Sequence, residues 1–147
     1  MKLKILLLTI LFWFSTGFYI TWDFRYPVAE PDIKTRVDWD ITHSGLLLLS
    51  YDLNRNKKPD YFTLRAIISS FYSDNSKDAV SKYFSGKPVF SVEYDNDRMF
   101  YVGQSHPLFY AYDFNEDGHF DVLFKDAFED GVNGNEQYYD SPSDNVG

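Results

Sequence analysis

The sequence feature that most constrains the fold is a run of acidic and amide side chains at alternate positions, set between two stretches of β-type sequence. In residues 113–124, DFNEDGHFDVLF, side-chain oxygens occur at the first, third, fifth and ninth positions, and glycine occupies the sixth. An apolar run follows directly. The pattern predicts a tight loop with its oxygens converging, placed between two strands of a hairpin.

The residue types in this loop predict a calcium site. Three carboxylates held close together at low local dielectric repel one another, and a divalent cation removes that repulsion. Ca²⁺ accepts roughly six to eight oxygen ligands in flexible geometry, and Gly118 permits the sharp bend. The expected ligands are the side chains of Asp113, Asn115, Asp117 and Asp121 and the backbone carbonyl of His119. The competing interpretation is a solvated turn, because Asp and Asn bond their own backbone in turns.

A second copy of the pattern lies upstream, in residues 52–63, DLNRNKKPDYFT. Both copies follow a tyrosine, and their first residues are 61 positions apart, so the chain contains two related units. The upstream copy has Lys57 in place of the glycine, which costs about 1–2 kcal/mol if that residue is left-handed. The expected ligands are Asp52, Asn54, Asn56 and Asp60, at a site that is weak or empty.

Composition excludes several classes of function. The chain has 147 residues, room for one domain, and a formal net charge of −8, which argues against binding to nucleic acid or to an anionic membrane surface. It contains no cysteine, so it has neither disulfides nor a thiolate metal site. Its histidines, His43, His106 and His119, are too dispersed to predict zinc.

The N-terminus is typical of an export signal. Lys2 and Lys4 precede an apolar stretch at residues 5–14, and the small residues 15–17 form a cleavage site. The alternative is an uncleaved membrane anchor, because the uncharged run 5–22 reaches the lower limit for a spanning helix. Either way the remainder is predicted to be extracytoplasmic, periplasmic or secreted, with membrane contact only through residues 1–22 if they are retained.

The rest of the chain predicts a mainly β fold, a small antiparallel sheet domain with one short helix. Residues 23–40 are expected to form an extended connector that joins a sheet edge near 37–41, residues 41–139 the domain, and residues 140–147 a disordered tail. Expected strands are 46–49, 61–68, 88–94, 99–103, 108–112 and 122–124, and the expected helix is 76–84. Residues 126–133 contain either a third, broken loop or an additional ligand.

The loop at residues 113–121 resembles the calcium loop of FG-GAP repeats, also called VCBS-type repeats. The resemblance covers about a dozen residues per copy. It implies that Asp113, Asn115, Asp117, His119 (by its carbonyl) and Asp121 hold Ca²⁺, and that Asp52, Asn54, Asn56, Lys58 (by its carbonyl) and Asp60 are the upstream equivalents. Two units are too few to close the propeller of that family. EF-hands and dockerins are disfavoured, because Thr63 and Phe124 stand where those loops need a carboxylate.

The function that follows is an exported, non-catalytic calcium-binding module with a binding or structural role and a protein partner in an extracytoplasmic assembly. One alternative is a membrane-anchored accessory subunit, which requires an intact N-terminal segment. Another is a secreted carbohydrate-active enzyme, which requires two carboxylates facing each other in a cleft. For Tyr138 and Tyr139, a glycan platform, a protein interface and ordinary packing remain open.

Overall fold

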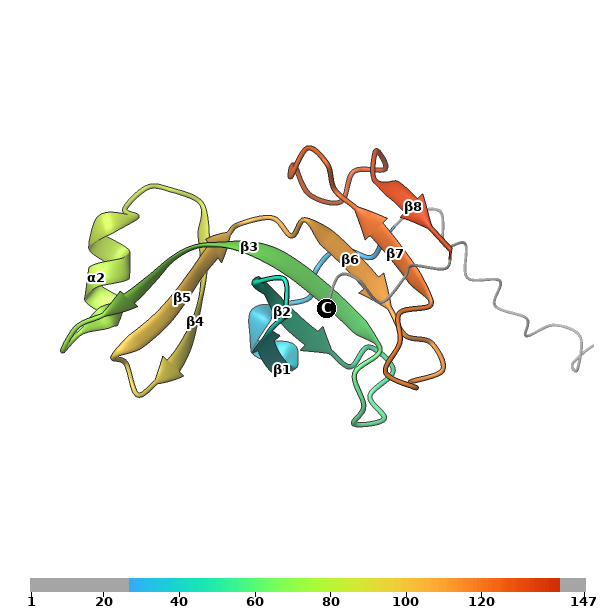
Figure 1. The fold of residues 1–147 in the computed structure, drawn as a ribbon, viewed down its shortest axis with the longest axis horizontal. Helices are drawn as coiled ribbons and strands as arrows, with labels where there is room; N and C mark the ends of the chain where they lie inside the picture. The colour runs from blue at the N-terminus through green and yellow to red at the C-terminus, as the bar shows by residue number, and fades with distance from the viewer. Residues whose placement is uncertain (1–26, 141–147) are drawn as a thin grey trace, which may run out of the picture.

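The computed structural model describes residues 27–140 (Figure 1). In this part of the chain eight antiparallel strands form two sheets that share β3 (Tyr61–Tyr72), and there are two short helices, the 3-10 helix η1 (Ile33–Thr35) and the α-helix α2 (Ser76–Tyr83). The prediction of a mainly β, antiparallel domain with one short α-helix is confirmed. The predictions for the signal or anchor segment 1–22 and for the tail after residue 140 lie outside the described residues. No helix among residues 27–140 is long and apolar enough to cross a membrane.

The main sheet holds the two Asp-rich loops. Its strand order is β1-β2-β3-β6-β7-β8, with β3 contributing only residues 61–66. The bounds are β1 Arg36–Ile41, β2 Leu46–Tyr51, β3 Tyr61–Tyr72, β6 Phe109–Tyr112, β7 Val122–Lys125 and β8 Gln137–Tyr139. A strand does form the sheet edge near residues 37–41, but it begins at Arg36, inside the span expected to be a connector, and β8 was not predicted.

The second sheet is an arm that carries the helix. Residues 67–72 of β3 pair with β5 (Met99–Gln104), which pairs with β4 (Val89–Asp95). A register shift between Ile67 and Ser69 marks the point where β3 passes from one sheet to the other. In Figure 1 the arm and its helix lie to one side of the main sheet, and β3 runs through both.

The helix α2 (Ser76–Tyr83) follows from local capping and one apolar contact surface. The Asn75 side chain accepts a hydrogen bond from the Asp78 N–H, which satisfies one free donor at the helix N-terminus. The helix ends at Tyr83 with Phe84 as its C-cap, and Gly86 follows with φ +73°. Val80 packs on Phe100 and Val102 of the arm, so burial of a few side chains holds this short helix in place.

The larger buried cluster lies on one face of the main sheet, and a smaller one, Phe62, Ala111 and Leu123, lies on the other. Alternation along β3 sends Tyr61, Thr63 and Arg65 to the face of the larger cluster. Cross-strand pairing places Tyr51, Tyr61 and Tyr112 in one row, with ring centroids 6.0 and 4.9 Å apart. The buried residues of the larger cluster are Leu47, Leu49, Tyr51, Tyr61, Val92, Tyr110, Tyr112, Val122 and Phe124.

Residues 27–32, here called the N-terminal strap, bond to this tyrosine row. The Val28 N–H donates to the Tyr112 hydroxyl at 2.7 Å, and the Tyr61 hydroxyl donates to the Val28 carbonyl at 2.6 Å. The Tyr51 hydroxyl donates to Glu30 Oε1 at 2.9 Å. Each buried hydroxyl thus has a partner, and that partner belongs to the strap in all three cases.

The strap also neutralises a buried charge. The Arg65 side chain is 1% exposed, and both of its terminal nitrogens donate to the Glu30 carboxylate. Its remaining donors reach Thr63 Oγ1 at 3.2 Å and the carbonyls of Gln104 and Ser105 at 3.0 and 3.1 Å. All five guanidinium N–H groups therefore have acceptors. The Phe90 ring covers the guanidinium at 4.0 Å.

The β1 edge of the main sheet is closed by its own side chains. Asp38 Oδ1 accepts the Trp39 N–H at 2.8 Å, and Asp40 Oδ1 accepts the Ile41 N–H at 2.7 Å. Backbone donors on this outer strand are therefore satisfied locally. Charged residues on an edge strand also discourage pairing with a further strand.

Replacement of Glu30 is expected to destabilise the fold strongly. Glu30→Ala leaves the Arg65 charge buried without its counter-ion, a change that typically costs about 3–5 kcal/mol. Chemical unfolding followed by circular dichroism measures this loss. Asp74→Ala, a carboxylate removed from an exposed position, is the control and should change stability by about 0.5 kcal/mol or less. Equally small losses of stability in the two variants would contradict the contribution to stability that is expected of the Glu30–Arg65 ion pair.

Alkaline unfolding is expected between pH 10 and 12. Burial raises the pKa of Tyr112 from its ordinary value of 10.0 to about 12, and it raises the pKa values of Tyr51 and Tyr61 further. A raised pKa in the folded state means that this stabilisation is complete below pH 10 and is lost as pH rises toward 12. Tyrosinate absorbance and circular dichroism should change together. Full titration near pH 10 with an unchanged dichroism signal would refute this expectation.

Candidate functional site

The Asp113 loop, residues 113–121 between β6 and β7, is organised around one buried carboxylate. Asp113 is 2% exposed, and its two oxygens accept the N–H groups of Asp117 at 3.1 Å and Gly118 at 2.8 Å. Asn115 Oδ1 accepts the same Asp117 N–H at 3.0 Å. Because one donor serves both side chains, the Asp113 and Asn115 oxygens converge on one point.

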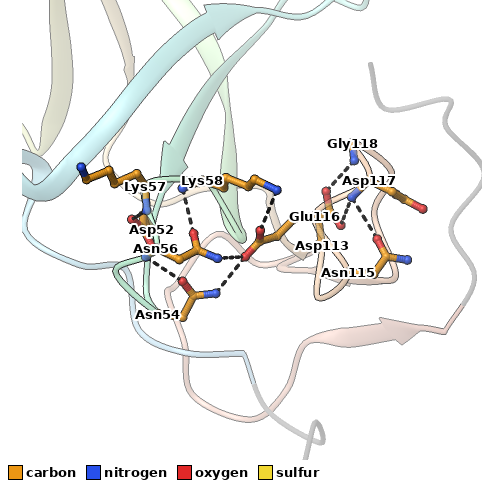
Figure 2. Close-up of polar contacts among 10 residues, drawn as sticks. All are labelled: Asp52, Asn54, Asn56, Lys57, Lys58, Asp113, Asn115, Glu116, Asp117 and Gly118. Atoms are coloured by element: carbon orange, nitrogen blue, oxygen red, sulfur yellow. Dashed lines mark hydrogen bonds and ion pairs between the residues drawn. The ribbon is translucent and has the colours of Figure 1, made fainter.

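The remaining predicted ligands close the same loop. Asp121 Oδ2 accepts the Phe114 N–H at 2.7 Å, which ties the end of the loop to its start. Asp117 Oδ1 accepts the His119 N–H at 2.9 Å. The structure therefore gathers all five predicted residues into one compact turn. Figure 2 shows three of them, Asp113, Asn115 and Asp117, around Gly118.

The upstream loop, residues 52–60 between β2 and β3, has the same pattern of hydrogen bonds. Asp52 accepts the N–H groups of Asn56 at 3.2 Å and Lys57 at 2.7 Å. Asn54 Oδ1 accepts the Asn56 N–H at 3.0 Å, and Asn56 Oδ1 accepts the Lys58 N–H at 2.9 Å. Asp60 Oδ1 accepts the Leu53 N–H at 2.8 Å. The upstream loop therefore keeps the hydrogen bonds of the Asp113 loop, although Lys57 stands in place of the glycine.

Backbone angles confirm that the two loops are one structural repeat. In the Asp113 loop the fourth and sixth residues, Glu116 and Gly118, have φ of +57° and +89°. The corresponding upstream residues, Arg55 and Lys57, have φ of +63° and +77°. Lys57 therefore carries the left-handed conformation that was expected to be costly for it.

A third loop with this geometry lies between β7 and β8. Asp126 is fully buried and accepts the N–H groups of Asp130 at 3.4 Å and Gly131 at 2.9 Å. Glu129 and Gly131 have φ of +53° and +89°. The broken loop suspected from the sequence thus has the same first turn. After this turn it differs, because Glu136 accepts the N–H groups of Asn133 and Gly134, both at 2.9 Å.

Antiparallel pairing places the first two loops at the same end of the main sheet. Tyr61 pairs with Tyr112, and the Asp113 N–H donates to the Asp60 carbonyl at 3.1 Å. The third loop lies at the opposite end (Figure 1). The two units that the sequence repeat identified are therefore neighbours in space.

Glu116 connects the two neighbouring loops. Its Oε1 accepts hydrogen bonds from Asn54 Nδ2 at 3.0 Å and from Asn56 Nδ2, and its Oε2 lies 3.6 Å from Lys58 Nζ (Figure 2). The hydrogen bonds from the two amides, together with the Lys58 charge, hold the pKa of Glu116 below its ordinary value. Sequence reasoning missed Glu116, because it stands at an even position between the predicted ligands.

The donor set is compatible with a hard cation, although the side chains are turned to the backbone. As they are placed, no three His, Cys, Asp or Glu side chains within residues 27–140 are grouped to hold a metal ion. A carboxylate has about four acceptor sites, and each oxygen of Asp113 uses one in the contacts above. Asp117 is exposed and Asp121 half-buried, so both have room to rotate. The three histidines lie apart, in the β1–β2 turn, the β5–β6 connection and the Asp113 loop.

Comparison of the chain with protein-family models, with curated proteins and with solved structures gave no match. The resemblance to FG-GAP calcium loops therefore stays a prediction that depends on the residues of the two loops.

Exchange of residues at the sixth loop position provides a direct test of the repeat. Lys57→Gly should raise the free energy of unfolding by about 1 kcal/mol, because glycine adopts positive φ without steric cost. Gly118→Ala should lower it by about 1–2 kcal/mol through backbone strain alone, since a Cβ at Gly118 meets nothing within 4 Å. Chemical unfolding of both variants measures these changes. A loss of stability in Lys57→Gly would show that Lys57 is not strained.

Proposed function

We propose that this chain is an exported, non-catalytic module that binds Ca²⁺ at the Asp113 loop. The observation that carries the proposal is the convergence of the Asp113 and Asn115 oxygens on one backbone N–H, beside the exposed carboxylate of Asp117. Oxygen donors of this kind are those that Ca²⁺ prefers. The ligands would be the side chains of Asp113, Asn115, Asp117 and Asp121 and the carbonyl of His119.

Charge supports the proposal. Asp113, Asp117 and Asp121 bring three negative charges into nine residues of one turn, and Glu116 adds a fourth. Glu116 is compensated by Lys58 from the neighbouring loop, but that contact lies outside the ring of predicted ligands. A divalent cation would relieve the repulsion among the other three carboxylates.

The role proposed for the ion is mechanical. A cation bound by residues at both ends of the loop would join β6 to β7 where the chain reverses, and β6 pairs with β3 beside it. Ion binding to the folded state would then stabilise the sheet by mass action. Partner binding would depend on calcium only through the fold.

The upstream loop is proposed to be the weaker site. It has the same backbone shape, but Asp52 and Asp60 are its only carboxylates, and Arg55, Lys57 and Lys58 place positive charge within it. These cations would oppose the binding of a second one. The ligands there would be the side chains of Asp52, Asn54, Asn56 and Asp60 and the carbonyl of Lys58.

The cellular setting belongs to the same proposal. The N-terminal sequence favours export, so the module would act in the periplasm or outside the cell, where calcium is available. A protein partner or extracytoplasmic assembly is proposed for it. If residues 1–22 are retained, the membrane anchor would lie a few residues before the strap that bonds to the tyrosine row.

Calorimetry on the domain beginning at residue 23 tests the proposal. Ca²⁺ should release or absorb heat and bind more tightly than Mg²⁺, because the larger ion accepts a flexible oxygen site while Mg²⁺ retains its waters. Asp117→Ala should raise the Kd for Ca²⁺ by roughly tenfold or more. Asn56→Ala, at the equivalent position of the upstream loop, is the matched control and should change it much less.

Three results would refute the assignment. These are the absence of heat with Ca²⁺, equal affinity for the two ions, and equal losses from Asp117→Ala and Asn56→Ala. The last would refute the ranking of the Asp113 loop above the upstream loop.

A further inference from the structure

The contact between the two loops has a consequence for the proposed site. Glu116 belongs to the Asp113 loop, yet its carboxylate contacts three side chains of the upstream loop, those of Asn54, Asn56 and Lys58. Glu116 is only partly accessible, with 13% of its side chain exposed, whereas Lys58 is 67% exposed. The two amides donate hydrogen bonds to Glu116, whereas the Lys58 ammonium lies 3.6 Å away and adds positive charge on the exposed side of the carboxylate.

These hydrogen bonds determine how the upstream amides are oriented. An asparagine side chain has one acceptor and one donor group, which lie on opposite sides of the amide. Because the Nδ2 groups of Asn54 and Asn56 both face Glu116, their Oδ1 atoms face the N–H groups of Asn56 and Lys58. The oxygens proposed as ligands of the upstream loop are thus directed by a residue of the other loop.

Glu116 is itself held by the Asp113 loop. It stands one residue after Asn115 and one before Asp117, and its φ of +57° is imposed by the turn that the Asp113 carboxylate closes. Anything that orders this turn fixes the position of the Glu116 carboxylate. The third loop offers an internal comparison, since Glu129 has the same position and a similar φ of +53° but stands in the loop at the other end of the sheet.

We propose that Glu116 is a positioning residue that couples the two loops, so that order in the Asp113 loop is transmitted to the donor oxygens of the upstream loop. The calcium-dependent part of this inference rests on the proposed function. The coupling itself does not, because it depends only on the contacts of Glu116 with Asn54, Asn56 and Lys58. By linkage, order imposed on either loop favours order in the other.

Amide hydrogen exchange in the presence of a chelator tests the coupling without metal. In Glu116→Ala, the Lys57 and Lys58 N–H groups, which are bonded to Asp52 and Asn56, should exchange about tenfold faster, the effect of losing a hydrogen bond to a charged group. Glu129→Ala should leave these rates unchanged. Asn56→Ala in the Glu116→Ala background should add little at Lys57, because the link is already broken. Unchanged exchange in Glu116→Ala would overturn the proposal.

A calcium titration followed by amide resonances tests the transmission. In the unmodified domain the signals of Asp117 and Gly118 should shift together with those of Lys57 and Lys58, at the same calcium concentration. In Glu116→Ala the first pair should still shift and the second pair should not follow it. Persistence of the upstream shift in this variant would contradict coupling through Glu116. If Asp117 and Gly118 do not respond even in the unmodified domain, calcium binding is refuted, while the exchange experiment still decides whether the loops are coupled.

Discussion

The buried guanidinium of Arg65 is the constraint on which much of the remaining structure depends. A charge with 1% exposure is tolerated only if counter-charge and acceptors surround it, and Glu30 provides both. Glu30 can reach this position only if the chain before β1 lies across the sheet. That requirement places the strap over the tyrosine row, where Val28 completes the hydrogen bonds of Tyr61 and Tyr112. One ion pair thus determines the course of a segment that has no regular secondary structure of its own.

The tyrosine row connects this core to the candidate site. Tyr51 and Tyr112 each stand immediately before an Asp-rich loop, and their rings are held by the strap on one side and by Tyr61 between them. The loops therefore leave the sheet from fixed positions, side by side. The packing of the tyrosine row therefore keeps the two loops close together, and this closeness allows Glu116 to contact the upstream loop.

Much of the fold was predictable because its signals are local. Short apolar runs, and alternation in residues 61–68, marked the strands beside the loops, and capping residues marked the helix predicted at 76–84 and found at 76–83. The spacing of oxygen side chains also predicted which residues gather in each turn. The contacts of Glu30 with Arg65 and of Glu116 with Asn54 join residues that are 35 and 62 positions apart. No local sequence pattern predicts such contacts. The strand β8 was missed because three residues amid Asp, Asn and Gly give no periodic signal.

The two outer strands of the main sheet differ in what they offer to another molecule. On β1, the carboxylates of Asp38 and Asp40 accept the N–H groups of the residues that follow them, which discourages this edge from pairing with a further strand. The edge strand β8 is short, and its Tyr138 and Tyr139 are exposed. If two copies of the main sheet pair edge to edge, β8 is the less protected edge of that sheet, and a contact that uses the same edge in both copies closes on itself. A contact of this kind ends at two molecules, whereas an edge that could pair with a different edge would allow the sheet to grow further.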